Sequence, residues 1–578
     1  MRAIIYDSAE KKWLSFTEPA AVFSSFSIDH VQRVLKSINR KVLESKLYAA
    51  GFISYQASPA FDRSLNVKPD YSLIPLISFA LYSKAEEIDS PALNNCNQEP
   101  FSTGPWNFSI TEDVYKDKIV EIKKYLEAGN TYQVNFTLPL KADFYGCPFS
   151  FFSHLLPDAK VKYAAYIESD DYAICSFSPE LFFIKQGKNI TMKPMKGTAP
   201  RGITPEDDRQ KREWLADSEK NRAENLMITD MIRNDISRIA ERGSVKVIDA
   251  FTIETYPTLF QMTSTVTAET DASLPEIFKA LFPCASITGA PKVSTMMIIE
   301  DLEPEARGIY TGSIGLIKPG GDALFNVAIR TVTIDKKKQK GTYGVGGGIV
   351  WDSDPEEEYK ECLTKCAIIR RSGDSFFLFE TIKYSDGEFF LLHEHLERIK
   401  SSANYYRIPF SRDDAVNKLA EAVKGSEPRD ILKIKFMLQP DGKIEIAVSP
   451  LTPLPEPYVI TAASAPLDRE NPFLYHKTSV RRMYNEALTK SGNYNDVIIF
   501  NKEMELTEST IANIVLRFNE DLYTPPVSCG LLPGTMRSSL IKSGRIKERV
   551  LYLNDLEKAN EIFLINSLRG WIKPLLKL

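Results

Sequence analysis

The chain has few cysteines, no strong excess of either charge and no long apolar run. Seven cysteines in 578 residues are too few for a disulfide framework, and no second Cys or His pair accompanies Cys362 and Cys366 at zinc-ligand spacing. A net charge of −4 without a basic stripe argues against nucleic acid as a partner. No segment reaches about 18 consecutive apolar residues, and the N-terminus turns polar at once. We therefore expect a cytoplasmic protein with no membrane span and no signal peptide.

The composition that remains is typical of a folded protein with several domains. Hydrophobic residues make up 43% and charged residues 26% of the chain, and its length exceeds what one core can bury. At 370–374 a charged helix gives way to the aromatic segment 376–379, so we place the main domain boundary there. We expect three parts, 1–105, 106–370 and 374–578, each with mixed α/β structure.

Hydrophobic periodicity predicts three further elements. Apolar residues alternate over 323–329, which indicates a strand, and we expect the glycine-dense segment 343–349 to be its neighbour. Ala223, Met227 and Met231 recur at helical spacing in a helix expected to end near Gly243.

One lysine stands in a setting that favours chemistry. Lys196 lies between Pro194 and Gly197, turn residues that hold the backbone while the amine projects, and Glu180 lies sixteen positions earlier. Most lysines are solvated surface charges. A buried lysine near other cations, however, can lose its proton and act as a nucleophile.

Three glutamates offer oxygen ligands. Glu224 lies on a predicted helix, and Glu358 and Glu361 are spaced to share one helix face. Mg²⁺ is usually bound through one or two carboxylates plus substrate. Because most helix glutamates are solvated, the residues by themselves leave a magnesium site and a surface cluster both open.

Two segments could receive an anion. Small residues over 286–290 precede Pro291, which suits the first turn of a helix, and would let a ligand approach free N–H groups. Arg330 can form a forked contact with a carboxylate. Taken alone, however, the first pattern is also plain helix-start chemistry, and an arginine that ends a strand is often a surface residue.

Together these motifs resemble the chorismate-using enzymes. Within that family they resemble aminodeoxychorismate synthase component I, because related anthranilate synthases carry a small residue where Lys196 stands. The resemblance implies that Lys196 attacks ring C2 of chorismate while Mg²⁺ assists departure of the C4 hydroxyl. Ammonia then attacks C4 and expels the lysine, with Glu180 as general acid and base. The implied magnesium ligands are Glu224, Glu358 and Glu361. The implied substrate-binding residues are Gln133, Thr288, Gly289, Ala290, Arg330, Tyr343, Gly346, Gly347 and Lys365.

Two features bear on the nucleophile. Isochorismate and salicylate synthases place a lysine at the position of Gln133 as the base that activates water, and glutamine cannot do this. Ammonia is therefore favoured. Neither Cys147 nor Cys529 stands in a glutaminase-type nucleophile turn, and the resemblance implies that a separate glutamine amidotransferase subunit supplies the ammonia.

The C-terminal part carries a second set of motifs. The segments 378–382 and 391–398 resemble the opening of the class IV aminotransferase family, which uses pyridoxal 5'-phosphate. His393 and His395 lack a third partner and are expected to be structural. The resemblance implies that Lys477 forms the Schiff base and that Glu508 pairs with the pyridine nitrogen. The implied phosphate contacts are Arg398 and Thr535. The chain has Ala512 where many relatives have serine.

The cofactor class leaves the second reaction open between a 4-amino-4-deoxychorismate lyase, a D-amino acid transaminase and a branched-chain transaminase. We favour the lyase because the upstream half would make its substrate, and Thr381 is a candidate for proton delivery. The hypothesis is a bifunctional enzyme of 4-aminobenzoate (folate precursor) synthesis. Its expected fold is α/β (α+β): an anthranilate synthase component I-like fold followed by a class IV pyridoxal-phosphate enzyme fold. The rivals are an anthranilate-type synthase joined to a transaminase, and a non-catalytic C-terminal module.

Overall fold

The computed structural model describes residues 1–70, 72–91, 99–159, 162–256, 259–370, 376–427 and 431–577. The chain forms two compact units. The first comprises Met1–Pro200 and Arg212–Gly373, and the second comprises Arg201–Lys211 and Asp374–Leu578. Most of the boundary expected at 370–374 falls outside the described residues.

The first unit is built on two large antiparallel sheets. The strands of one sheet, in spatial order, are β17 (Gly289–Ala290), β9 (Gln133–Gly146), β21 (Lys340–Ile349), β20 (Thr331–Asp335), β11 (Tyr172–Ser178), β10 (Tyr163–Glu168), β1 (Arg2–Asp7), β2 (Lys12–Phe16) and β6 (Glu86–Ile88), with β7 (Phe101–Thr103) and β8 (Asn107–Phe108) also on β9. Those of the other are β14 (Met195–Pro200), β16 (Leu259–Glu269), β13 (Asn189–Lys193), β12 (Leu181–Gln186), β19 (Ala323–Val327), β18 (Ser313–Ile317), β4 (Tyr48–Ile53), β5 (Ile77–Tyr82) and β3 (Ala21–Ser25), with β15 (Lys246–Thr255) on β16.

One predicted pairing is wrong. The strand β19 was expected beside the glycine-dense β21, but β21 lies in the other sheet between β20 and β9. The reason is a change of sheet between β19 and β20. Arg330, with a φ of 49°, lies where the chain turns from one sheet into the other.

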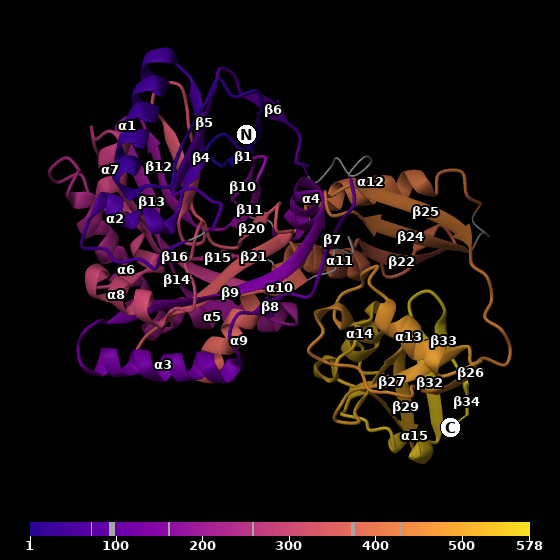
Figure 1. The fold of residues 1–578 in the computed structure, drawn as a ribbon. Coiled ribbons are helices and arrows are strands. Elements are labelled where there is room, and N and C mark those ends of the chain that lie inside the picture. The colour runs from indigo at the N-terminus through magenta and orange to yellow at the C-terminus, as the bar shows by residue number, and fades with distance from the viewer. Residues whose placement is uncertain are drawn as a thin grey trace. The chain divides into compact units, whose positions relative to one another are not determined.

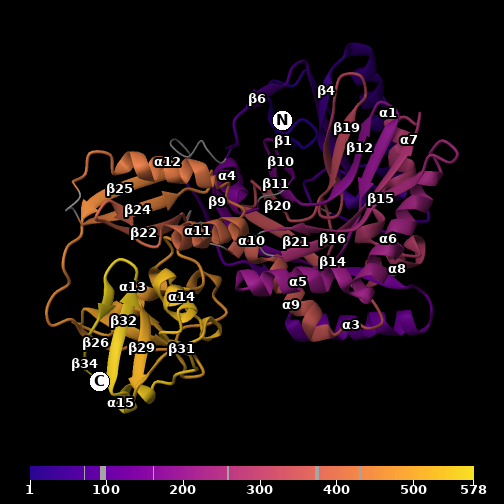
Figure 2. The same cartoon turned by 180° about the vertical axis from the view of Figure 1, so that it is seen from behind.

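Helices cover the outer face of each sheet. The helices of this unit are α1 (Ile28–Ser45), α2 (Ser58–Phe61), α3 (Glu112–Glu127), α4 (Pro148–Ala159), α6 (Glu219–Ser237), α7 (Leu274–Leu281), α8 (Lys292–Leu302), α9 (Pro355–Lys365) and α10 (Ala367–Arg370), while α5 (Pro205–Asp217) begins in the segment assigned to the second unit. Figure 1 and Figure 2 both show α1, α6 and α7 beside the β12–β14 sheet, and α3 next to α9 near β9 and β21. The result is a layered order of helices, sheet, sheet and helices.

Alternating strand residues fill these layers. Ile5, Phe16 and Phe52 pack between the two sheets. Successive side chains of a strand point to opposite faces, so the neighbours of these residues face away from this layer. On α1, Val31, Leu35, Ile38 and Val42 recur every three or four residues and are fully buried against the β12–β14 sheet.

The helix through Ala223–Met231 is confirmed as α6, but it ends at Ser237 rather than near Gly243. The amides of Ile239 and Ala240 both donate to the Ile236 carbonyl, so the chain leaves the helix in a turn. Because Ile239 and Ala240 still pack against the core, the apolar pattern runs past the end of the helix.

The second unit has a smaller and a larger sheet. The smaller contains β23 (Glu388–Phe389), β22 (Leu378–Ser385), β24 (Leu432–Leu438) and β25 (Ile444–Pro450), with α11 (Leu392–Tyr406) and α12 (Arg412–Ala422). The larger contains β31 (Lys547–Glu548), β30 (Asp521–Thr524), β29 (Asn513–Phe518), β28 (Leu506–Ser509), β27 (Asp496–Phe500), β26 (Val459–Ala462), β34 (Leu575–Leu576), β32 (Glu561–Asn566) and β33 (Gly570–Ile572), with α13 (Arg482–Lys490), α14 (Thr535–Lys542) and α15 (Asp555–Lys558). Within the described ranges, no helix combines the length and apolarity that a bilayer crossing needs.

Candidate active sites

Lys196 lies in an irregular part of β14 that aims its side chain across to the other sheet. Pairing between β14 and β16 shifts register between Met195 and Thr198, and Gly197 has a φ of 94°, a conformation that favours glycine. A Cβ added to Gly348 of β21 would lie 2.1 Å from the Lys196 Nζ. The amine therefore packs against the backbone of β21. Burial lowers its pKa, and nearby Glu224 opposes that shift.

Gln133 reaches the same point of β21. Its side chain is fully buried, and its Nε2 lies 2.8 Å from the position of a Cβ on Gly348. Within the described part of the chain, neither the Nε2 nor the Oε1 of Gln133 has a hydrogen-bond partner. Because an unpaired buried amide is costly, this group is suited to contact a ligand.

Glu180 immediately precedes β12 and is 4% exposed. The Ser286 hydroxyl donates to its Oε1 over 2.6 Å, and the Val327 amide donates to its backbone carbonyl. Burial raises the pKa of Glu180 to about 7, while the Ser286 hydrogen bond opposes that rise. A carboxyl group with a pKa near neutrality can both donate and accept a proton.

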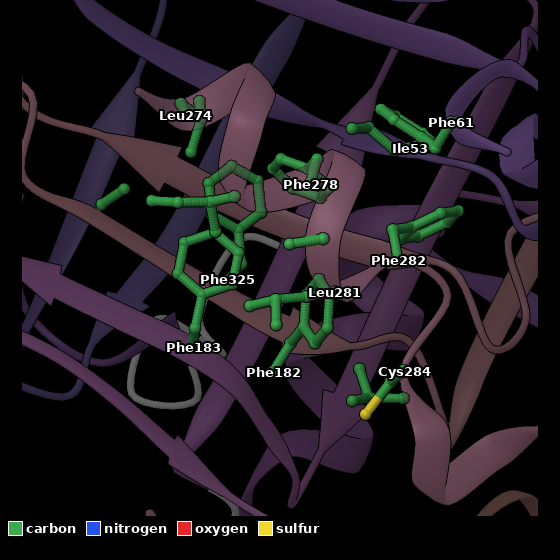
Figure 3. Close-up of a cluster of buried hydrophobic side chains, with 14 of the residues drawn as sticks. Ile53, Phe61, Phe182, Phe183, Leu274, Phe278, Leu281, Phe282, Cys284 and Phe325 are labelled. Atoms are coloured by element: carbon green, nitrogen blue, oxygen red, sulfur yellow. The ribbon is translucent and has the colours of Figure 1, made fainter. Parts of the chain in front are cut away.

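An aromatic core holds Glu180 and Ser286 in place. Phe182 and Phe183 follow Glu180 on β12 and pack against Phe278 of α7. Figure 3 shows these rings together with Cys284, which lies two residues before Ser286. Both partners of the Ser286–Glu180 hydrogen bond are thus anchored by neighbours in one cluster.

The three predicted metal ligands act electrostatically on the same lysine. Glu224 projects from α6, and Glu358 and Glu361 project from α9. All three raise the pKa of Lys196. The Ser353 hydroxyl donates to the Glu358 Oε1 over 2.6 Å.

Three further contacts define this region. Lys365 forms a 2.7 Å ion pair with Glu361 and donates to the Gly346 carbonyl. A Cβ on Gly347 would lie 2.8 Å from the Glu358 Oε2, so the carboxylate packs against bare backbone. Among the residues that the structure describes, no group of three His, Cys, Asp or Glu side chains is arranged to hold a metal ion.

The predicted anion-binding residues differ in whether their polar groups already have a partner. Arg330 is half-buried, its guanidinium lies 5.6 Å from the centroid of the Tyr256 ring, and burial lowers its pKa. It forms no ion pair with any residue in the described ranges, so it can receive a carboxylate. The Tyr343 hydroxyl donates to the Lys365 carbonyl, and its ring lies in the core.

The Thr288–Ala290 segment lies alongside Gln133. Gly289 and Ala290 form β17, in which Ala290 pairs with Gln133 of β9. The Thr288 hydroxyl donates to the Ala285 and Cys284 carbonyls, so it is already used within the loop. The structure therefore brings Lys196 and Gln133 together at Gly348, and it places Glu358 against the neighbouring Gly347. The Tyr343 and Thr288 hydroxyls are engaged by backbone carbonyls.

In the second unit, Lys477 is the central cation. Burial lowers its pKa to about 8, and Arg398 adds to this effect. Its Nζ lies 5.0 Å from the centroid of the Phe379 ring. A lysine amine with a pKa this low loses its proton far more readily than a solvated lysine, and it therefore suits attachment to an aldehyde cofactor.

Arg398 is held by a buried carboxylate. Glu380 accepts hydrogen bonds from the Arg398 Nε (2.8 Å) and Nη2 (2.6 Å), and its Oε2 lies 2.7 Å from the His395 Nδ1. The other ring nitrogen of His395 lies 3.0 Å from the Ser567 hydroxyl and 3.4 Å from that of Thr535. His395 is thus part of a hydrogen-bonded network that links Arg398 to Thr535, the two predicted phosphate contacts.

Glu508 lies at the end of a polar cluster. The Tyr484 hydroxyl donates to its Oε1 over 2.8 Å, the Leu532 amide donates over 3.2 Å, and Asn513 lies 3.3 Å from its Oε2. Burial raises its pKa to about 7. A ring nitrogen carrying a proton would find an acceptor here. Thr381 lies on β22, paired with Lys435 of β24.

Several supporting residues were missed by sequence reasoning. Gly348, Ser286, Glu380, Tyr484 and Asn225 all contact a predicted site residue in the structure. Gly348, Ser286, Glu380 and Asn225 lie inside segments that were singled out, so proximity in sequence was a signal. Tyr484 is an ordinary residue of α13, and only its tertiary contact with Glu508 reveals it.

Two family models match the chain. That of the chorismate binding enzymes matches residues 1–371, and that of the class IV amino-transferases matches residues 377–573. Aminodeoxychorismate synthase component 1 of Salmonella typhimurium is 40% identical over 265 residues, which cover 46% of this chain and 58% of that protein. Anthranilate synthase component 1 of Cereibacter sphaeroides is 32% identical over 325 residues, with coverage of 54% and 64%. The chain thus spans less than two thirds of the length of each relative.

A solved structure shares the fold of the first unit. Anthranilate synthase component I from Streptococcus pneumoniae has a TM-score of 0.52 and 23% identity, over 64% of this chain and 92% of that chain. The expected α/β fold class is therefore confirmed. The chain belongs to the chorismate binding enzyme family and carries a class IV amino-transferase domain after it.

Proposed function

We propose that the protein makes 4-aminobenzoate, a folate precursor, from chorismate in two successive reactions. The first aminates chorismate at C4 to give 4-amino-4-deoxychorismate. The second eliminates pyruvate and leaves the aromatic product. The similarity to aminodeoxychorismate synthase component 1 over 265 residues supports the first reaction, and the class IV amino-transferase match supports a cofactor-dependent second one.

The observation that carries the proposal is the position of Lys196. Its amine, whose pKa burial lowers, packs against Gly348 beside the unpartnered amide of Gln133. An uncharged amine in that place can form a bond to ring C2 of chorismate as the C4 hydroxyl leaves. Ammonia then bonds to C4, and the bond between C2 and the lysine breaks.

Glu180 is suited to the accompanying proton transfers. With a pKa of about 7, it can give a proton to the departing hydroxyl and take one from the incoming ammonia. Arg330, which has no ion pair with the described residues, would bind a substrate carboxylate. Gln133 carries no ionisable group, so it would orient the reactants without activating water.

Glu224, Glu358 and Glu361 would hold Mg²⁺, which would neutralise charge on the bound substrate. Mg²⁺ usually takes one or two protein carboxylates and completes its shell with water and substrate, so a subset of these three would suffice. All three carboxylates interact electrostatically with the Lys196 amine. The arrangement is therefore compatible with Mg²⁺ beside the reacting ring.

In the second unit, Lys477, Glu508, Arg398 and Thr535 would hold pyridoxal 5'-phosphate, which would serve as an electron sink. The buried Glu508 acceptor and the network joining Arg398 to Thr535 fit its ring nitrogen and its phosphate. Lys477, with a pKa of about 8, can remove the ring proton that must leave before pyruvate departs. Thr381 remains the candidate for proton delivery.

Ammonia would come from a separate glutamine amidotransferase subunit. The proposed location is the cytosol, where the cysteines of the described ranges, all of them free thiols, would stay reduced.

The decisive experiment incubates the purified chain with chorismate, Mg²⁺, pyridoxal 5'-phosphate and an ammonium salt, and identifies the product. We expect 4-aminobenzoate and pyruvate, and no turnover when glutamine replaces the ammonium salt. Formation of 2-aminobenzoate would contradict amination at C4. Accumulation of 4-amino-4-deoxychorismate alone would contradict the second reaction, and glutamine-dependent turnover without a partner would contradict the separate subunit.

A further inference from the structure

The open face of the smaller sheet in the second unit carries an unassigned cation. On β22, Leu378, Glu380 and Ile382 are buried, whereas Phe379 and Thr381 alternate with them and point to the opposite face. Thr381 pairs directly with Lys435 of β24, and paired residues of antiparallel strands project to the same side. Lys435 therefore shares a face with Phe379 and Thr381.

The Lys435 amine and the Lys477 amine both lie near the ring of Phe379. The Lys435 Nζ is 5.6 Å from the centroid of the Phe377 ring and 5.7 Å from that of Phe379. The Lys477 Nζ is 5.0 Å from the centroid of the same Phe379 ring. Both amines thus flank one aromatic side chain, whose face also attracts cations.

No carboxylate among the residues that the structure describes pairs with Lys435. Lys435 is half-buried and forms no ion pair with any residue in the ranges that the structure describes. The glutamate on the neighbouring strand that could approach this face, Glu445, pairs with Lys443 instead, at 2.9 Å. Near Lys477, the carboxylate of Glu380 is taken up by Arg398 and His395.

A second carboxylate on the substrate would supply the missing charge. The proposed substrate carries its amine on a six-membered ring, with a carboxylate opposite the amine and an enolpyruvyl ether beside it. It therefore brings two negative charges to the Lys477 site. An amino acid with a branched apolar side chain would place hydrocarbon near an unneutralised ammonium, which is unfavourable when the group loses water.

We propose that Lys435 binds a carboxylate of the substrate in the C-terminal site, and so selects a cyclic dicarboxylate amine over an amino acid with an apolar side chain. This assignment rests on the proposed lyase function and names the residue that recognises its substrate. It also accounts for a cation placed opposite Thr381, the candidate for proton delivery.

The test measures pyruvate release from 4-amino-4-deoxychorismate by the cofactor-loaded full chain. We expect Lys435→Met to raise KM by about 10- to 100-fold, because it removes one contact to a charged group. Lys435→Arg should keep most of the wild-type KM. The matched control is Lys433→Met, two residues along the same strand and on the same face, where KM should change by no more than about twofold.

The cofactor provides a readout besides turnover. Its absorbance and its dissociation constant should be the same in wild type and Lys435→Met, which shows that the variant folds and loads. An unchanged KM in a loaded Lys435→Met enzyme would overturn this inference while the proposed function stands. A wild-type chain that releases no pyruvate from this substrate would overturn the proposed function, and the inference with it.

Discussion

The Ser286 hydroxyl limits how far burial can raise the pKa of Glu180. Burial raises its pKa to about 7, and the 2.6 Å hydrogen bond from Ser286 limits the rise. The Ser286 hydroxyl stabilises the charged carboxylate of Glu180, whereas desolvation destabilises it. The two effects therefore shift the pKa in opposite directions. Lys196 shows the complementary case, because burial lowers its pKa and so favours the neutral amine.

Removing the Ser286 hydroxyl should move the pH profile of ring amination. In Ser286→Ala the charged form of Glu180 loses its donor, so its pKa rises. We expect the limb of the kcat/KM profile near pH 7 to shift to higher pH by about 1 to 2 units, the equivalent of one hydrogen bond to a charged group.

Ser54→Ala is the control for this shift, since the Ser54 hydroxyl is also buried and donates to the Pro75 carbonyl of the same unit. It should leave the limb in place. A profile for Ser286→Ala that superimposes on the wild-type profile would show that Glu180 does not control the reaction.

At the scale of the element, α6 clamps the irregular strand that carries Lys196. Asn225 is fully buried, and its Nδ2 donates to the Lys196 carbonyl over 3.1 Å and to the Met262 carbonyl over 3.2 Å. Its Oδ1 accepts a 2.6 Å hydrogen bond from the Ser264 hydroxyl. One helix side chain thus ties β14 to β16 at the point where their register shifts.

Asn225→Ala should cost both stability and activity. It leaves two carbonyls and one hydroxyl without their partner, and we expect the free energy of unfolding of the first unit to fall by about 2–4 kcal/mol. Ring amination with ammonium should fall at least about tenfold, because the Lys196 backbone is released. The measurements are the urea midpoint and the initial rate.

Asn234→Ala, on the exposed side of the same helix, serves as the comparison and should change both quantities little. An Asn225→Ala protein as stable as this comparison variant would mean that the clamp is unimportant.

At the scale of the whole molecule, each unit contains its own core and its own candidate site. Lys196 and its partners belong to the first unit, and Lys477 and its partners belong to the second. Because no predicted site residue of one reaction lies in the unit of the other, the two reactions should be separable by single substitutions.

We expect Lys477→Ala to accumulate 4-amino-4-deoxychorismate from chorismate and ammonium. Lys196→Ala should make none, yet still convert added 4-amino-4-deoxychorismate to 4-aminobenzoate. Mixing the two variants should restore 4-aminobenzoate formation from chorismate, measured by chromatography. If Lys196→Ala aminates chorismate at the wild-type rate, covalent catalysis by this lysine is excluded.

The residue types and their order along the chain were sufficient to identify both families. Lys196 between turn residues, the α9 glutamates and the order of Arg398, Lys477, Glu508 and Thr535 are local patterns, and the family matches agree with them. The strand and helix periodicities also predicted β19 and α6, because burial of one face produces a regular spacing of apolar residues in the sequence.

Tertiary structure alone decided what each side chain contacts. The position of β21 in the other sheet places Gly348 against Lys196, although local alternation suggested a different neighbour. The Ser286–Glu180, Asn225–Lys196 and Glu380–Arg398 contacts join residues from separate elements. Hydrophobic periodicity reports which face is buried but not which strand lies beside it, and a pKa depends on burial and neighbours that only the folded chain assembles.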